Sequence, residues 1–155
     1  EGGHRIPFLA RWPNQIETGT SSNETICLTD LLKTCAAING VDVPSSAGED
    51  SYNILPALVG NPSSPIREAT VSTAGNGAFS VRQGRWKLEL TGSTGGYGNI
   101  SQEEVAAKGQ PSVQLYDLEN DIGETNNLYA QYPDVIRRLT SLLESYRERG
   151  RSTRL

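Results

Sequence analysis

The stretch that decides the fold is Ala78-Phe79-Ser80-Val81-Arg82-Gln83-Gly84-Arg85-Trp86-Lys87-Leu88-Glu89-Leu90. Apolar and polar residues alternate on both sides of Gly84. This period of two predicts a pair of antiparallel strands, Ala78–Gln83 and Trp86–Leu90, joined by a turn near that glycine.

Each strand of this hairpin is predicted to have one apolar face and one polar face. The apolar positions are Phe79 and Val81, followed by Trp86, Leu88 and Leu90. The polar positions between them are Arg82, Lys87 and Glu89. The alternation therefore predicts a sheet with one face buried and the other face in water.

Further strands and a long helix are predicted on either side of the hairpin. Residues 68–73 and 113–116 are predicted to form two more short strands. Between Pro133 and Gly150, apolar residues recur at the spacing of one helix face. They are Val135, Ile136, Leu139, Leu142, Leu143 and Tyr146. This stripe predicts a helix that covers one face of a small sheet and ends at Gly150.

The N-terminal part is predicted to hold one strand and two helical segments. Ile6–Trp12 is short and apolar, which indicates a buried strand. A helix that ends at Asn39-Gly40 is predicted from the apolar face that precedes it. That face consists of Leu28, Leu31, Leu32, Cys35 and Ala36. Residues 54–59 predict one or two helical turns, whereas residues 92–110 contain too many Gly and polar residues for regular structure.

The composition argues against two classes of partner. The chain has 155 residues, a formal net charge of -4, and 14 Lys and Arg that form no long run, which argues against nucleic acid. No apolar run approaches the roughly 20 residues that span a bilayer, so no membrane partner is expected. Hydrophobic residues make up only 35% of the chain, which is low for an independent domain of this size.

Cys27 and Cys35 are the only cysteines. They do not form a Cys-x-x-Cys pair, and no nearby His completes a set of ligands, so no metal site is expected in this segment. The favoured interpretation is two buried free thiols. A disulfide, or a partner for either thiol in another part of the protein, stays open as the alternative.

Five stretches of the chain resemble, in order, segments of the sulfatases of the alkaline-phosphatase superfamily. The stretches are Glu1–Pro13 (EGGHRIPFLARWP), Leu28–Thr34 (LTDLLKT), Glu49–Leu58 (EDSYNILPAL), Phe79–Leu88 (FSVRQGRWKL) and Leu115–Leu128 (LYDLENDIGETNNL). Each stretch alone is a weak signal. Five in the family's order, over nearly the whole chain, identify it as resembling the C-terminal part of a sulfatase.

The resemblance implies an α+β fold. A small antiparallel four-stranded sheet is expected to pack on a long C-terminal helix, preceded by the last strand and helix of a truncated large α/β domain. Residues 1–66 are expected to form the end of that large domain, and residues 67–155 the C-terminal subdomain.

The resemblance also implies that the intact parent hydrolyses the sulfate ester of an aryl compound or a carbohydrate. In the family, a Cys or Ser in a C-x-P-x-R or S-x-P-x-R signature becomes formylglycine, whose hydrate attacks sulfur, and Ca2+ neutralises the sulfate oxygens. Neither signature is present here, and neither is the Asp-rich metal segment. We therefore expect no catalytic residue and no metal ligand in this segment, and no turnover by the chain alone.

Two residues of the first motif are candidates for contact with substrate. His4 is the only histidine, and it either lines the substrate pocket as a proton donor or packs against a backbone group. The neighbouring Arg5 either contacts substrate or forms a buried ion pair that fixes the loop, and the ion pair is favoured.

Two more candidates follow from a departure from the family. Ser72 and Thr73 stand where many bacterial relatives have a His-His-Ser sequence, so they are expected to face substrate and to alter its choice. The segment Gly92–Tyr97 resembles a Gly-rich loop of some members. Its backbone N–H groups can contact an anion, although a plain flexible loop is the favoured interpretation.

The resemblance further implies the partners and the location of the protein. The partners are the missing N-terminal catalytic domain and, through the parent, a sulfated small molecule or glycan. The face of residues 1–40 that meets the missing domain is expected to be unusually apolar, so the isolated chain is expected to self-associate through it. A secreted or periplasmic location is implied by resemblance only.

Two other functions stay open at this point. One is a phosphodiesterase or phosphonate hydrolase of the same superfamily, which the nucleophile segment would distinguish from a sulfatase. The other is a non-catalytic module that binds sulfated glycans, and the net negative charge and the low hydrophobic content argue against it.

Overall fold

The structure is a computed structural model that describes residues 3–60, 62–94 and 101–154. The chain divides into two compact units. The sheet unit comprises residues 69–147, and the N-terminal unit comprises the described residues up to 68 together with residues 148–154.

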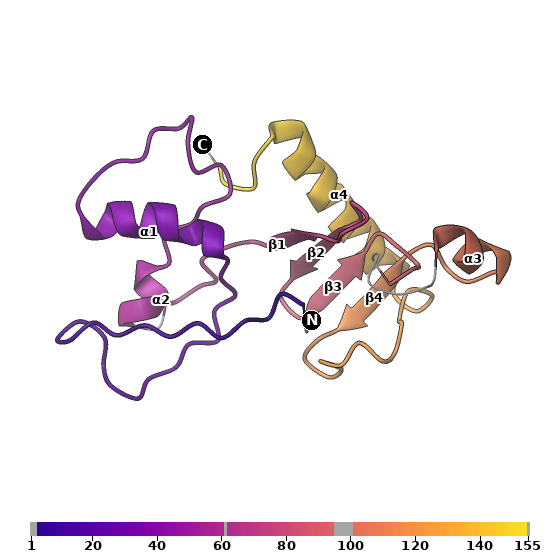
Figure 1. The fold of residues 1–155 in the computed structure, drawn as a ribbon, viewed down its shortest axis with the longest axis horizontal. Helices are drawn as coiled ribbons and strands as arrows, with labels where there is room; N and C mark the ends of the chain where they lie inside the picture. The colour runs from indigo at the N-terminus through magenta and orange to yellow at the C-terminus, as the bar shows by residue number, and fades with distance from the viewer. Residues whose placement is uncertain (1–2, 61, 95–100, 155) are drawn as a thin grey trace. The chain divides into compact units, whose positions relative to one another are not determined.

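The sheet unit contains four antiparallel strands in the order β1-β2-β3-β4 (Figure 1). The strands are β1 (Thr70–Thr73), β2 (Phe79–Gln83), β3 (Trp86–Glu89) and β4 (Gln114–Asp117). The turn between β2 and β3 contains Gly84, which has a φ of +58°, a backbone conformation that favours glycine. The predicted hairpin and the α+β fold class are therefore confirmed.

The long helix α4 (Pro133–Arg149) packs on one face of this sheet (Figure 1). The predicted stripe supplies the helix side of the core, because Leu139 and Leu143 are almost completely buried. The buried core residues of the unit are Ala69, Val81, Leu88, Leu115, Leu139, Leu143 and Tyr146. Each large apolar side chain that is buried in this way stabilises the fold by about 1.5–3 kcal/mol relative to exposure.

The prediction that residues 92–110 lack regular structure is wrong for part of the segment. Helix α3 (Gln102–Ala107) forms there. Ser101 accepts a hydrogen bond from the backbone N–H of Glu104, and the Glu104 carboxylate accepts one from the backbone N–H of Ser101. This reciprocal capping box satisfies two backbone donors, and the burial of Val105 fixes the short helix.

The N-terminal unit contains the helical segments that the sequence predicts. A short 3-10 helix η1 (Leu28–Asp30) leads into α1 (Leu31–Ile38), and α2 (Leu55–Val59) follows. Gly40 has a φ of +64° directly after α1, as expected for a glycine that ends a helix.

The predicted buried strand at Ile6–Trp12 is wrong. This stretch has no regular secondary structure, and Leu9 is 94% exposed. A strand must pair its backbone N–H and C=O groups with a neighbouring strand, and the described part of this unit contains no strand.

Asp30 is the buried polar centre of the N-terminal unit. Its carboxylate accepts hydrogen bonds from the backbone N–H groups of Cys27 at 2.7 Å and Tyr52 at 3.0 Å. Arg67 donates to the same carboxylate at 2.7 Å and lies over the Tyr52 ring. The Asp30 carboxylate therefore forms a buried ion pair with Arg67 and, through the Tyr52 backbone, joins two of the five family-like stretches.

The N-terminal unit carries most of the exposed apolar side chains of the described chain. Those that are more than a third exposed in this unit are Ile6, Phe8, Leu9, Leu28, Leu31, Leu32, Ile38, Val41 and Val59. Seven of these side chains lie in residues 1–40, the stretch for which an apolar face is expected. In the part of the chain that the structure describes, no helix has the length and apolar character needed to cross a membrane.

Candidate functional site

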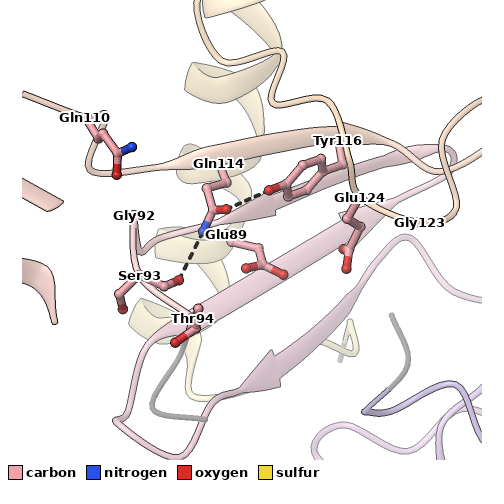
Figure 2. Close-up of a pocket in the computed structure, with 9 residues that line it drawn as sticks. All are labelled: Glu89, Gly92, Ser93, Thr94, Gln110, Gln114, Tyr116, Gly123 and Glu124. Carbon is pink, nitrogen blue, oxygen red and sulfur yellow. Dashed lines mark hydrogen bonds between the residues drawn. The ribbon is translucent and has the colours of Figure 1, made fainter. Parts of the chain in front are cut away.

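A cavity of about 500 Å³ lies on the polar side of the sheet, within the sheet unit (Figure 2). Its lining side chains come from β3 and β4 and from the segments that follow β3 and β4 in the chain. The lining residues are Glu89, Gly92, Ser93, Thr94, Gln110, Gln114, Tyr116, Gly123 and Glu124.

Strand register brings the polar side chains of the cavity together. Glu89 on β3 pairs directly with Gln114 on β4 and with Ser80 on β2. Ser80 in turn pairs with Ser72 on β1, so one row of polar residues crosses the whole sheet. Directly paired residues of antiparallel strands point to the same face.

Lys87 is a buried residue on the polar face of the sheet. Its Nζ lies 2.6 Å from Glu124 Oε1 and 2.9 Å from Glu89 Oε1, and its side chain is only 3% exposed. The prediction that Lys87 lies on a wet face is therefore wrong. The two carboxylates form ion pairs with the ammonium group, and this permits its burial.

These ion pairs shift the pKa values of Lys87 and Glu124. Burial by itself lowers the pKa of Lys87, but the hydrogen bonds to Glu124 and Glu89 outweigh it, and the net pKa lies above the ordinary value. Burial by itself raises the pKa of Glu124, but the hydrogen bond from Lys87 contributes to a net lowering. Both shifts favour the charged forms of Lys87 and Glu124 at neutral pH.

Tyr116 and Gln114 form a hydrogen-bonded pair beside the carboxylates. Tyr116 donates through its hydroxyl to Gln114 Oε1 at 2.6 Å, and Gln114 Nε2 donates to the backbone carbonyl of Ser93 (Figure 2). Gln114 Nε2 also donates to the backbone carbonyl of Thr91. Burial, followed by the negative charges of Glu89 and Glu124, raises the pKa of Tyr116 to about 12. The phenol therefore stays protonated at neutral pH and remains a donor.

The arrangement favours binding of a hydroxyl-rich group. The carboxylates of Glu89 and Glu124 both form ion pairs with the ammonium group of Lys87. Figure 2 shows the side chains of Glu89 and Glu124 directed into the same space as Ser93 and Thr94. Carboxylate oxygens accept hydrogen bonds, and serine, threonine and amide groups both donate and accept them.

The predicted site residues fall in both units. His4 and Arg5 belong to the N-terminal unit, and both are exposed. Both lie in a stretch that has no regular secondary structure.

Ser72 and Thr73 lie at the end of β1 in the sheet unit, on opposite faces. Ser72 belongs to the polar row that includes Glu89 and Gln114. Thr73 pairs with Phe79, whose side chain packs against the core. The structure therefore places Ser72, but not Thr73, on the face that carries the cavity.

The Gly-rich segment that was considered as an anion loop is described only in part. Gly95–Tyr97 lies outside the described residues, whereas Gly92, Ser93 and Thr94 line the cavity. A Cβ atom at Gly92 would lie 2.2 Å from the Pro111 carbonyl oxygen, so only glycine fits at this point.

Both cysteines are free thiols, and neither is fully buried as predicted. Cys35 is exposed on the apolar face of α1, and Cys27 is half-buried. Burial raises the pKa of Cys27 above its ordinary value, and Arg67 donates a hydrogen bond to its sulfur. The described residues contain no cluster of three or more His, Cys, Asp or Glu that can hold a metal ion.

Sequence reasoning missed the cavity, although part of its signal is present. In Gln114-Leu115-Tyr116, the polar positions alternate with a core leucine, which indicates that Gln114 and Tyr116 share a face. Glu124 carries no such signal, because it lies in an irregular segment. Its φ of +55° and its contact with Lys87 are visible only in the tertiary structure.

No family model matches the chain. Curated relatives do match it over nearly its whole length. The chain is 32% identical to an N-acetylgalactosamine-6-O-sulfatase of Bacteroides thetaiotaomicron, with 96% of this chain and 28% of the relative covered. It is 31% identical to human arylsulfatase A, with 92% of this chain and 30% of the relative covered. The chain thus spans less than a third of the length of these relatives.

The chain is also similar to parts of solved structures. One, from work on the metabolism of multiple glycosaminoglycans by Bacteroides thetaiotaomicron, is 32% identical with a TM-score of 0.59, over 75% of this chain and 24% of that one. Another, of a protein in complex with its substrate D-glucosamine-2-N,6-O-disulfate, has a TM-score of 0.65 over 89% of this chain and 27% of that one. At 23% identity, the second structure shows a likeness of fold alone.

Proposed function

Because this chain belongs to the sulfatase family as a C-terminal sulfatase-like part, we propose that the protein that contains it hydrolyses a sulfate ester. The products are an alcohol and free sulfate. The observation that carries the proposal is the similarity to named sulfatases over 85–96% of the chain.

A sulfated carbohydrate is the substrate class that we favour. The relatives at 31–32% identity include an N-acetylgalactosamine-6-O-sulfatase and a sulfatase of Formosa agariphila that is active on ulvan. The cavity supports this choice because hydroxyl, amide and carboxylate groups line it. The curated relatives that match are sulfatases, which favours sulfate over phosphate diesters or phosphonates as the substrate.

The chemical step itself is assigned to residues outside this segment. Ca2+ does not fit here, because the described residues hold no suitable group of ligands. Formylglycine does not fit either, since Cys27 is followed by Leu28-Thr29 and Cys35 by Ala36-Ala37. We therefore place both groups in the N-terminal catalytic domain, which is the principal partner of this chain, and expect no turnover from the chain alone.

The role proposed for this segment is to form part of the substrate-binding wall. Ser72 is the best supported of the predicted residues, since it shares a face with the cavity. His4, Arg5 and Thr73 remain proposals for contact with substrate that rest on the family-like motifs alone. A secreted or periplasmic location is likewise a proposal.

A turnover assay on the longer protein tests the function. We expect sulfate release from N-acetylgalactosamine 6-sulfate or 4-nitrophenyl sulfate in the presence of Ca2+, measured by ion chromatography. We expect much slower cleavage of bis(4-nitrophenyl) phosphate, and no sulfate release by residues 1–155 alone. Faster cleavage of the phosphodiester would overturn the proposal.

A further inference from the structure

We propose that the turn at Asn76-Gly77, between β1 and β2, is a site of spontaneous deamidation, at which the side-chain amide of Asn76 is converted to aspartate and isoaspartate. The modification consumes only water, and it does not depend on the proposed function. The chain has two Asn-Gly pairs, Asn39-Gly40 and Asn76-Gly77, and their hydrogen bonds distinguish them.

The reaction has two steps that balance with water alone. The backbone nitrogen of the glycine attacks Cγ of the asparagine, so an N–Cγ bond forms, the Cγ–Nδ2 bond breaks, and ammonia leaves with the proton of the glycine N–H. Water then opens the cyclic imide. Opening at Cγ gives aspartate, whereas opening at the main-chain carbonyl gives isoaspartate, in which the backbone runs through the side chain.

Both Asn-Gly pairs are accessible to this chemistry. The asparagine and the glycine of each pair are exposed, so water can reach them. Glycine has no Cβ to obstruct the approach of its nitrogen. Among the described residues, no atom lies within 4 Å of a Cβ placed on Gly40 or Gly77, so both glycines have open space around them. Sequence and exposure therefore do not separate the two pairs.

The side chain of Asn76 is arranged for attack. The backbone N–H of Ala78 donates a hydrogen bond to Asn76 Oδ1 at 3.1 Å. Negative charge develops on this oxygen when the Gly77 nitrogen adds to Cγ. A donor that is already directed at the atom that gains charge stabilises the transition state. The Gly77 N–H donates to the Ala74 carbonyl at 2.9 Å, and this bond must open before the attack.

The end of helix α1 holds Asn39 against the same reaction. Its hydrogen bond is made by Nδ2, the leaving nitrogen, which donates to the Cys35 carbonyl at 2.7 Å. A ψ of +2° at Asn39 directs the Gly40 nitrogen away from the side chain. Rotation of that nitrogen toward Cγ would also disturb the bond from the Val41 N–H to the Ala36 carbonyl, at 2.9 Å. A reacting pair that is held out of line reacts slowly.

Deamidation at Asn76 is expected to loosen β1. This strand is at the edge of the sheet and pairs with β2 alone among the described strands. Its last pair is Thr73 with Phe79, and the turn beyond is closed by the Ala74 N–H, which donates to the Ala78 carbonyl at 2.8 Å. Isoaspartate adds a carbon atom to the backbone of this turn, and the length of a hairpin loop fixes strand register.

The two pairs can be compared within one chain. Residues 1–155 would be incubated at neutral pH, in native buffer and in urea, and then digested with trypsin. Peptides 34–67 and 68–82 contain one Asn-Gly pair each. Mass spectrometry measures the conversion of amide to acid, and isoaspartyl methyltransferase labels the isoaspartate. We expect Asn76 to react at least fivefold faster than Asn39 in the folded chain, and the two rates to agree within about twofold in urea.

Two variants assign the product to its residue. Asn76→Gln lengthens the side chain, so the ring that must close is larger and less favourable, and we expect the product in peptide 68–82 to disappear. The matched control Asn39→Gln should leave conversion at Asn76 unchanged. In the deamidated chain, hydrogen exchange of the β1 amides is expected to be faster than in the Asn76→Gln variant.

Several results would overturn the inference. They are conversion of Asn39 at an equal or higher rate in the folded chain, absence of conversion at Asn76 in the folded chain, and an equally strong preference for Asn76 in urea. Unchanged exchange of the β1 amides would overturn the expected loosening of the strand. Sulfate release by the longer protein is measured separately and bears on none of these outcomes.

Discussion

At the scale of single residues, Lys87 holds the polar face of the sheet together. Its ammonium group is almost completely buried and pairs with carboxylates from β3 and from the segment after β4. Removal of one partner from a buried ion pair leaves the other charge uncompensated, which typically costs about 3–5 kcal/mol. The integrity of the cavity therefore depends on this one side chain.

The pH dependence of stability follows from the same cluster. The pKa of Glu124 is lowered in the folded state, so its stabilising contribution is present above its ordinary pKa of 4.5 and is lost as the pH falls through the folded value. The pKa of Lys87 is raised, so its contribution is present below 10.5 and is lost as the pH rises through the folded value.

We predict that Glu124→Gln lowers the free energy of unfolding at pH 7 and flattens its decline between pH 5 and pH 3. Urea titrations followed by Trp86 fluorescence in a Trp12→Phe background report on the sheet unit. Glu17→Gln is the control, because Glu17 is exposed in the other unit. An unaltered decline in the Glu124 variant would contradict the assigned role.

Gly92 supplies a second prediction at this scale. A Cβ atom there would lie 2.6 Å from Val105 Cγ1 as well as 2.2 Å from the Pro111 carbonyl oxygen. Gly92→Ala is therefore expected to destabilise the sheet unit by about 1–3 kcal/mol, as overpacked substitutions do. Gly123→Ala meets its nearest side chain at an ordinary 3.5 Å and serves as the control in the same urea titration. Equal stability of the two variants would contradict the close contact.

At the scale of elements, Asp30 joins η1, the segment before α2, and Arg67. Its carboxylate accepts from Cys27 and Tyr52 backbone N–H groups and from the Arg67 guanidinium. The hydroxyl of Thr34, one turn along α1, donates to the Asp30 carbonyl and accepts from the backbone N–H of Ile54. Few apolar residues are buried in this unit, so these polar contacts carry much of its order.

We predict that Asp30→Asn destabilises the N-terminal unit by about 3 kcal/mol, because Arg67 loses its charged partner in a buried site. Hydrogen exchange read by mass spectrometry should show faster exchange of the Cys27 and Tyr52 amides. Asp42→Asn is the control, since Asp42 is exposed. Protection of both amides that equals that of the unaltered chain would contradict the role of the network.

At the scale of the whole molecule, the two units differ in how far they bury their apolar residues. The sheet unit buries a core between its sheet and α4. The N-terminal unit instead exposes leucines at Leu9, Leu28 and Leu32, with Leu9 almost entirely in water. Apolar surface in water is unfavourable by about 25 cal/mol per Å², which favours contact between such surfaces.

We predict that the isolated chain self-associates through this surface. Sedimentation velocity is expected to show a concentration-dependent rise in mass, together with enhanced fluorescence of the dye ANS. The triple variant Leu9→Gln, Leu28→Gln and Leu32→Gln should reduce both signals while far-UV circular dichroism is unchanged. Ile122→Gln, at an exposed site in the sheet unit, is the control. Persistence of association in the triple variant would contradict the assignment.

Much of the fold was predictable because its signals are local. The alternation around Gly84 predicts β2 and β3, and the apolar stripe after Pro133 predicts α4, since both depend on the repeat of one element. The capping box at Ser101 and Glu104 is also a local signal, and it accounts for α3 inside a Gly-rich stretch. The apolar stretch Ile6–Trp12 led to the wrong prediction of a strand, because an apolar run forms a strand only where a partner strand is present.

The candidate site was less predictable, because its residues are distant in sequence. Glu89 and Gln114 meet through strand register, and Glu124 reaches Lys87 from an irregular segment. His4 and Arg5 were selected from a motif, and the structure finds both exposed. The sequence by itself determined the family, the β2–β3 hairpin and the apolar stripe of α4, since periodicity and the order of motifs depend only on the order of residues in the chain. Only the tertiary structure decided which charges share the cavity, because ion pairs and cavity walls depend on contacts between segments far apart in the chain.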